Sequence, residues 1–484
     1  MPRVILVCVV VFLAVAAVVT YRTLTVQTMQ PAVQAHPPVD LDPQSAAERL
    51  AAAIQIQTIT RDDAPLPEDA LEAFARFLAE HYPETHNTLS HVNVLAHSIL
   101  YTWQGSDKAL PALVLMAHQD VVPAENAETW TVAPFAGEIK DGYVWGRGAL
   151  DDKGNLLTIM EAVEYLIATG FSPRRTIHLA FGHDEEIGGE GAVALANILE
   201  GQEVGMVLDE GMAIVHDQVP GVKAPVALVG ISEKGYASLD LVVEQDAGHS
   251  SMPPESTSVG ILAKAVVALE DAPFPSRLRG PSRQLFEFIA PEADLPYRIA
   301  FANLWLFGGA IGLALAGEPT TAALLRTTTA ATMFTGSPKD NVLPRRAEAT
   351  VNVRIAPGET VESVVQRVVD VVNDKRVAIN VRDGASDPSP ISPVDGRAFR
   401  VLQRTILETS PDVLVAPALM IGGTDARHYR QVSDSVLRFS PERFYPGDTD
   451  RLHGVDERRS VEGHVAGIRF YIRLIENVND VDAL

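Results

Sequence analysis

Short apolar runs alternate with longer helical patterns along this chain, and this alternation limits its possible folds more than any other feature. Runs typical of buried strands cover residues 112–117, 176–181 and 204–208, and helical patterns cover 156–168 and 191–199. Strands and helices that alternate in this way form a mostly parallel sheet with helices on both faces. Ligands of such sheets bind beyond the carboxyl ends of the strands. We therefore predict an α/β fold whose functional residues follow the strands.

The middle of the chain has a different pattern, in which strands with alternating apolar and polar residues dominate. Predicted strands cover 237–244, 327–334, 348–355 and 377–381, and predicted helices cover 258–269 and 360–373. This α+β pattern predicts a smaller separate domain at 233–386. Because the α/β pattern resumes at residue 399, the smaller domain is inserted into the larger one, which comprises 46–232 and 387–484.

The first residues form an apolar segment that points to a membrane. Residues 4–19 are uninterruptedly apolar and lie between Arg3 and Arg22. As a helix they span about 24 Å, slightly less than the ~30 Å hydrocarbon core of a bilayer. We favour an uncleaved anchor at 1–29 over a cleaved signal, because no clear cleavage site follows; a buried core helix is the third alternative. The folded part is then membrane-anchored outside the cytoplasm, or secreted if the segment is cleaved. Residues 30–45, rich in Pro, Ala and Gln, predict a linker.

The composition limits both the partners and the metal ligands. The sequence has 39 Lys and Arg against 62 Asp and Glu, for a formal net charge of -23. This charge argues against nucleic-acid binding through phosphate contacts and suits divalent cations, although an acidic soluble surface gives the same excess. The single cysteine, Cys8, lies in the apolar segment. Any metal must therefore use nitrogen and oxygen ligands.

Histidine and carboxylate side chains gather in five short clusters, most of which follow predicted strands. The clusters are His118 with Asp120, Asp151 with Asp152, His183 to Glu186, Asp209 with Glu210, and His453. Taken singly, each has a simpler explanation, such as a surface pair, a helix cap or an acidic turn. Taken together, they bring histidines and carboxylates to one edge of a parallel sheet. Mixed nitrogen and oxygen donors suit Zn²⁺ or a similar transition ion.

In order and spacing, these clusters resemble those of the metallopeptidase family that contains carboxypeptidase S, glutamate carboxypeptidase, the aminoacylases and the N-fatty-acyl-amino-acid hydrolases. The resemblance runs from about residue 46 to the end of the chain. It is fullest over 137–154 and 231–254, where it favours the carboxypeptidase S and N-fatty-acyl-amino-acid hydrolase branch. It implies a two-zinc amidohydrolase whose inserted domain is a lid or dimerisation domain.

The resemblance also implies the roles of the clustered residues. Asp151 would bridge two zinc ions. His118 and Asp209 would complete one site, and Glu186 and His453 the other; Co²⁺ or Mn²⁺ could occupy the same ligands. Of two further carboxylates, Glu185 would be the general base and Asp120 would orient His118.

Substrate-binding residues are implied in the same way. They are Asn341, Arg354, Gly423 and Thr424, and His249 is implied as a further catalytic residue. His249 would lie over the substrate, often from a partner subunit, and stabilise the oxyanion; a homodimer through the inserted domain is implied by the family alone. Arg354 and Asn341 would help to hold the substrate carboxylate. An outward-facing strand residue is the alternative for Arg354, because Val353 and Ile355 alternate with it.

The predicted activity is hydrolysis, or formation in the reverse direction, of the amide bond in N-acyl amino acids or in short peptides with a free carboxylate. A Gly-X carboxypeptidase or dipeptidase is the alternative within the same chemistry. A binding relative that has lost catalysis is more remote, because every implied ligand and the base are present. The apolar stretch 301–317 predicts a core helix of the inserted domain, with an acyl-chain wall or a membrane-facing lid as the alternative.

Overall fold

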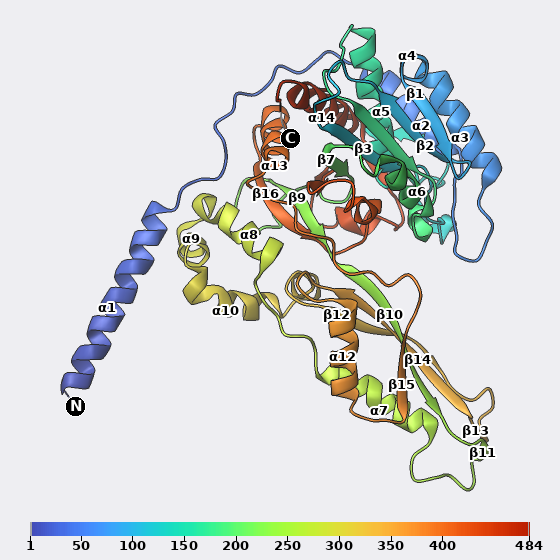
Figure 1. The fold of residues 1–484 in the computed structure, drawn as a ribbon, viewed down its shortest axis with the longest axis vertical. Helices are drawn as coiled ribbons and strands as arrows, with labels where there is room; N and C mark the ends of the chain where they lie inside the picture. Colours follow the sequence, from blue (N-terminus) through green and yellow to red (C-terminus); the bar gives the residue numbers. More distant parts are fainter. Residues whose placement is uncertain (1, 483) are drawn as a thin grey trace.

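The structure is a computed structural model that describes residues 2–482 and residue 484. Figure 1 shows a large α/β body, a slender second body that projects from it, and an N-terminal helix whose C-terminal end lies beside the large body while the rest of the helix extends away from it. A ten-stranded mixed sheet runs through the large body.

The central strands of this sheet are parallel. In spatial order they are β6 (Ile177–Gly182), β3 (Ala112–His118), β7 (Val204–Asp209) and β17 (Val436–Arg438). Antiparallel strands β2 (Ser98–Trp103) and β1 (Ser90–Val94) extend the sheet beyond β6. Beyond β17 lie β9 (Val226–Glu233), its parallel neighbour β16 (Leu414–Met420), and the short strands β8 (Ile214–Val215) and β18 (Arg443–Phe444).

Helices cover both faces of the sheet, as the alternation of apolar runs predicts. They are α2 (Pro43–Gln55), α5 (Lys153–Ala168), α13 (Arg397–Thr409) and α14 (Val461–Asn479) on one face and α6 (Glu190–Leu199) on the other. β3 is buried along its whole length, and its side chains alternate between the two layers. Leu113 and Leu115 pack in the core with α5 and α14, whereas Val114 and Met116 pack with α6. The predicted α/β class with a mostly parallel central sheet is confirmed.

The projecting body is a smaller antiparallel unit with a core of its own. Its main sheet has the order β12 (Thr328–Thr335), β14 (Arg346–Ile355), β10 (Gly235–Glu244) and β15 (Val377–Val381), and it carries helices α7 (Ser258–Asp271) and α12 (Val361–Val372). Leu239 and Leu241 of β10 face these helices, while the alternating Ser238 and Asp240 lie on the other face. A short pair, β11 (Gly248–His249) with β13 (Val342–Leu343), forms the tip.

Four helices lie between α7 and β12 in the segment that the sequence assigned to the inserted domain, and the first three of them pack on the large body. They are α8 (Gly280–Ile289), α9 (Leu295–Phe301), α10 (Leu304–Leu315) and α11 (Pro319–Ala323). Phe286, Ile289 and Phe301 belong to the core of the large body, and α8 contacts β16. The predicted core helix at 301–317 is wrong. Only Gly312 of α10 is buried, because no element of the described chain covers its outer side.

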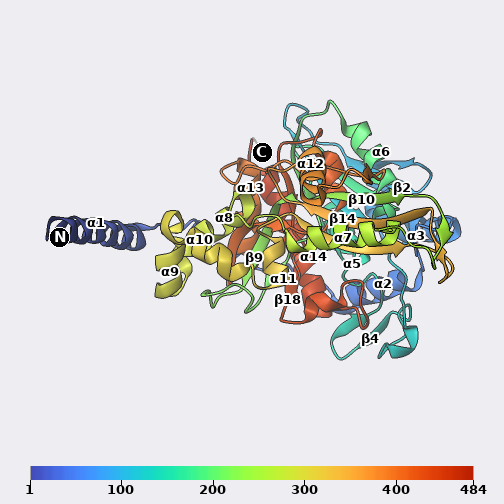
Figure 2. The same ribbon diagram turned by 90° about the horizontal axis from the view of Figure 1, so that it is seen from below.

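The N-terminal helix α1 (Pro2–Thr25) contains an apolar segment, Arg3–Thr25, that is long enough to cross a membrane and is not buried in the protein. Figure 2 shows that α1 projects from one end of the molecule.

Residues 28–39, which combine the end of the predicted anchor segment 1–29 with most of the predicted linker 30–45, are extended and bonded to the large body; we call them the strap. Nε2 of Gln30 donates to the backbone oxygen of Val415 at 2.9 Å, and Oε1 of Gln30 accepts from the backbone N–H of Val415 at 3.0 Å. Further along, the backbone N–H of His36 donates to the backbone oxygen of Glu408 at 2.8 Å. The chain that leads from α1 to α2 is therefore held in place by partners distant in sequence.

Candidate metal centre

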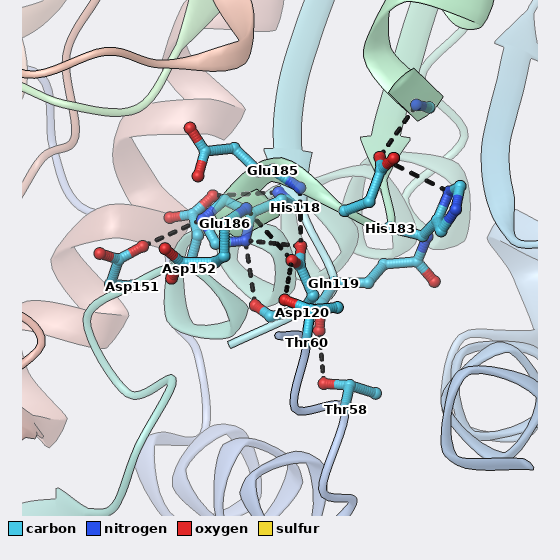
Figure 3. A network of polar contacts seen from close by, with 12 residues as sticks. Thr58, Thr60, His118, Gln119, Asp120, Asp151, Asp152, His183, Glu185 and Glu186 are labelled. Carbon is cyan, nitrogen blue, oxygen red and sulfur yellow. Dashed lines mark hydrogen bonds and ion pairs between the residues drawn. The ribbon is translucent and has the colours of Figure 1, made fainter. Parts of the chain in front are cut away.

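Three parallel strands end together and bring the polar clusters to one edge of the sheet. β3 ends at His118, which pairs with Gly182 at the end of β6, and β7 ends at Asp209 on the other side of β3. Figure 3 shows that His118 and the side chains of Asp151 and Glu186, which come from neighbouring loops, converge. The meeting of clusters that the sequence predicts is thus present for these three residues.

His118 is buried, and both of its ring nitrogens have partners. Nδ1 lies 3.0 Å from the backbone oxygen of Asp120 and 3.3 Å from its carboxylate. Nε2 lies 3.0 Å from Oδ1 of Asp151 and 3.4 Å from Oε1 of Glu210. Metal-binding histidines are typically held through their second nitrogen in this way. Nε2 is therefore the nitrogen that would face a cation.

Asp120 also fixes the loop that follows β6. Its carboxylate accepts hydrogen bonds from the backbone N–H groups of Glu185 at 3.1 Å and Glu186 at 3.2 Å, and from the hydroxyl of Thr60 at 2.7 Å. Burial acts to raise the pKa of Asp120, but the hydrogen bond and charge of His118 outweigh it, so the pKa is lowered. An ionised Asp120 thus holds His118 and both glutamates in one arrangement.

His453 lies on the opposite side of Asp151. Its Nε2 is 3.1 Å from Oδ2 of Asp151 and 3.3 Å from Oε2 of Glu186. The hydrogen bonds to these two carboxylates raise the pKa of His453 to about 10. One oxygen of Asp151 therefore faces His118 while the other faces His453. A carboxylate placed in this way can bridge two cations.

The carboxylate beside His118 belongs to Glu210, whereas the family resemblance implied Asp209. Asp209 is the last residue of β7, and its Oδ2 accepts a hydrogen bond from the backbone N–H of Ala426 at 2.7 Å. Successive residues of an extended chain point in opposite directions, so Glu210 faces the cluster while Asp209 points away from it. Of the two, Glu210 alone belongs to a group that could hold an ion.

Two groups of three side chains have donor atoms and spacing that fit a cation. One is His118, Asp152 and Glu210, the other is His118, Asp151 and Glu186, and the donor atoms of each group lie within 4.8 Å of one another. Oδ1 of Asp152 and Oε1 of Glu186 are buried without a hydrogen-bond partner. Burial and the nearby charge of Asp151 raise the pKa of Glu210 to about 7 and raise that of Glu186. Divalent cations fit such a cluster, because they would neutralise carboxylates that repel one another.

We expect Glu210→Gln to weaken metal binding by about 100-fold or more. Removing a residue that only orients a metal ligand lowers metal affinity by up to about 100-fold, and removing a ligand itself should lower it at least as much. Asp209→Asn is the matched control, because an asparagine oxygen can still accept from Ala426, and it should stay within about tenfold of the wild type. Titration of metal-stripped protein with Zn²⁺ and with Co²⁺ measures both affinities. A larger loss in the Asp209 variant would restore Asp209 as the ligand.

Glu457 organises the loop of Asp151, and sequence reasoning missed this role. Its Oε1 accepts hydrogen bonds from the backbone N–H groups of Gly148 at 3.0 Å and Asp151 at 3.2 Å, and its Oε2 pairs with the guanidinium of Arg147. Gly148 has a φ of +89°, a conformation that glycine adopts without strain. The segment that carries His453 is thereby fixed to the loop that carries Asp151. Only its place shortly after that histidine could have pointed to Glu457.

The loop of Gly423 and Thr424 lies beside the cluster, but the Thr424 hydroxyl already has a partner. It donates to Oε2 of Glu233 at 3.0 Å, and the same oxygen accepts from Nε of Arg438 at 2.8 Å. These three side chains are buried. A side chain added at Gly423 would meet Arg427. Substrate contact at Gly423 and Thr424 stays a prediction, and it would have to use backbone groups.

His249, Asn341 and Arg354 do not meet within one chain. His249 in β11 and Asn341, just before β13, lie together at the tip of the projecting body (Figure 1). Arg354 lies at the root of that body, with its guanidinium 4.9 Å from the ring centre of Tyr236. The ten residues of β14 separate the two ends by about 30 Å. His249 and Asn341 therefore lie far from the metal cluster of their own chain.

Comparison with known sequences identifies the family. The profile of Peptidase family M20/M25/M40 matches residues 114–477. The chain is 42% identical over 440 residues to "Probable carboxypeptidase S-like 2" of Dictyostelium discoideum, a match that covers 89% of this chain and 84% of that protein. It is 40% identical over 440 residues to "N-fatty-acyl-amino acid synthase/hydrolase PM20D1" of Homo sapiens, with 89% and 87% covered.

Solved structures share the fold. The M20 family metallo-carboxypeptidase Sso-CP2 from Sulfolobus solfataricus has a TM-score of 0.66 at 17% identity, covering 90% of this chain and 99% of that one. Human carnosine dipeptidase 1 has a TM-score of 0.62 at 17% identity, with 92% and 100% covered. The family profile matches well over half of the chain. This protein is therefore a metal-dependent hydrolase of amide bonds that belongs to peptidase family M20/M25/M40.

Proposed function

We propose that this chain cleaves, and in the reverse direction forms, the amide bond between an acyl group and an amino acid with a free carboxylate. The observation that carries the proposal is the position of Asp151. Its Oδ1 lies 3.0 Å from Nε2 of His118 and its Oδ2 lies 3.1 Å from Nε2 of His453. This position supports a centre of two bridged cations, which we assign as Zn²⁺, with Co²⁺ or Mn²⁺ able to use the same ligands.

In the proposed centre, His118, Asp151 and Glu210 would hold one cation, and Asp151, Glu186 and His453 would hold the other. Asp152 supports the first site, because its Oδ2 accepts from the backbone N–H of His118 at 3.4 Å. When bound, two such cations lower the pKa of a shared water towards neutrality and polarise the scissile carbonyl.

Glu185 is the proposed general base. It belongs to neither ligand group, and its backbone N–H is bonded to Oδ1 of Asp120 at 3.1 Å. Its carboxylate would take the proton of the attacking water and return it to the leaving amine. Asp120 thus serves two functions, since it orients His118 and holds the base beside the cluster.

We also propose that a second copy of the chain completes the site through the projecting body. His249 and Asn341 are exposed at the tip, about 30 Å of strand away from the root. From a partner chain, His249 would donate to the oxyanion and Asn341 would contact the substrate. Arg354 would bind the substrate carboxylate as a charge-assisted pair.

The substrate class rests on relatives named as a carboxypeptidase S-like protein and as an N-fatty-acyl-amino acid synthase/hydrolase. We expect kcat/KM for a long-chain acyl-phenylalanine to exceed that for glycyl-phenylalanine by about tenfold or more, because each buried methylene adds discrimination. Steady-state kinetics of the metal-loaded protein measure both. A preference for the dipeptide would favour the Gly-X carboxypeptidase or dipeptidase alternative. Inactivity towards both compounds would favour a binding relative.

For localisation, we propose that α1 is an uncleaved anchor with the large body outside the cytoplasm; secretion is the alternative if α1 is cleaved. The length of the apolar segment Arg3–Thr25 and its exposure support an anchor.

A further inference from the structure

Helices α9 and α10, which we call the α9–α10 hairpin, present an unusually apolar surface. No charged residue lies between Arg298 and Glu318. Trp305 is 51% exposed, Leu306 43% and Leu313 80%. Scattered apolar residues are common on protein surfaces, but a continuous apolar patch marks an interaction site.

This surface is continuous with α1. Nδ2 of Asn303 donates one hydrogen bond to Oγ1 of Thr23 at 3.2 Å and another to the backbone oxygen of Val19 at 3.4 Å. Nε of Arg22 donates to the backbone oxygen of Ala302 at 3.2 Å. Figures 1 and 2 both show the hairpin beside the C-terminal end of α1. The turn of the hairpin therefore lies against the last turns of the helix that is apolar enough to cross a membrane.

The length of the hairpin limits how it can meet a bilayer. α10 has 12 residues, which span about 18 Å, less than the ~30 Å hydrocarbon core. The chain also bends by 109° between α9 and α10. Such a hairpin cannot cross a bilayer, but it can lie in one leaflet. Tyr297 and Trp305, which are 43% and 51% exposed, suit the interface between hydrocarbon and headgroups.

We propose that the α9–α10 hairpin inserts into the leaflet that holds the C-terminal part of α1, so that its partner is a lipid bilayer. The polar contacts with α1 favour a bilayer over a second copy of the chain or the acyl chain of a substrate, because neither of those explains why α1 lies alongside. The strap, bonded to the large body from Gln30 to Val39, limits the motion of α1. Two membrane contacts then give the large body one orientation on the membrane.

Trp305 makes this proposal testable in the full chain. The sequence has four tryptophans, and the other three, Trp103, Trp130 and Trp145, are buried. In phosphatidylcholine vesicles with brominated acyl chains, we expect quenching of the tryptophan emission, and we expect Trp305→Phe to abolish that quenching. No quenching in the wild type, or equal quenching in the variant, would overturn the proposal.

Polar substitutions distinguish the bilayer from other partners. A Leu306→Asp, Leu313→Asp double variant should lose the quenching while α1 keeps the protein in the vesicle fraction. Val92→Asp is the matched control, since Val92 is 49% exposed on β1, and it should keep the quenching. If the double variant keeps the quenching but loses self-association, the hairpin joins two copies. If it keeps the quenching but raises KM for long-chain substrates alone, the hairpin binds acyl chains. Either result contradicts the proposal.

Discussion

Glu185→Gln is expected to lower turnover of an acyl amino acid by about 10²–10⁴-fold while leaving the bound metal in place. Glutamine has nearly the same shape as glutamate, but its amide cannot take a proton from water. Glu185 belongs to neither candidate ligand group, and its backbone N–H bond to Asp120 survives the substitution. The expected defect is therefore in proton transfer alone.

Metal content by mass spectrometry and kcat on the same preparation measure this effect. Glu190→Gln is the control, because Glu190 is exposed at the start of α6 and lies five residues further along the chain. Its kcat should equal that of the wild type. Undiminished turnover in Glu185→Gln would exclude Glu185 as the base, and loss of metal would make it a ligand instead.

Glu457→Gln is expected to lower the free energy of unfolding by about 3–5 kcal/mol, the usual effect of removing one partner of a buried ion pair. Glu457 is fully buried and Arg147 is 1% exposed. Burial raises the pKa of Glu457 to about 6 even beside Arg147. Most of the loss should therefore come from the unpaired arginine. We also expect weaker metal binding, because the loop of Asp151 loses its support.

Urea unfolding of the metal-free protein and titration with Zn²⁺ measure the two effects separately. Glu408→Gln is the matched control, since Glu408 pairs with Arg404 and Arg473 on α13 and α14. It should lower stability without weakening metal binding. An Arg147→Met, Glu457→Met double variant should recover part of the lost stability, because both charges are then absent. Unchanged stability and metal affinity in Glu457→Gln would remove its structural role.

The strands of the large body could be predicted because their apolar residues are buried on both faces. The runs at 112–117, 176–181 and 204–208 correspond to β3, β6 and β7 to within one residue at each end. The convergence of the clusters also followed from this pattern, because parallel strands share one carboxyl edge. The direction of a side chain at a strand end did not follow. Asp209 and Glu210 are adjacent carboxylates, and which of them faces His118 depends on where β7 ends. β7 ends at Asp209, and Glu210 is the one that faces His118.

Features that depend on distant partners had no local signal. α8 to α10 were placed in the inserted domain because they lie inside its sequence, yet Phe286 and Phe301 pack in the core of the large body. The strap has the composition of a flexible linker, but it is fixed by bonds to α13, α14 and β16. The role of Glu457 also had no local signal, because its partners Arg147 and Gly148 are about 300 residues earlier in the chain.

The bonds between Gln30 and Val415 have a consequence for shortened forms of the protein. In the described chain β16 pairs with β9 alone, so its other side is an open sheet edge. Open edges can recruit strands from other molecules and lead to aggregation. Gln30 uses its side-chain amide to satisfy both backbone groups of Val415 on that side. A chain cut after Thr25 keeps this protection, whereas a chain that begins after Gln30 exposes the edge and becomes prone to self-association.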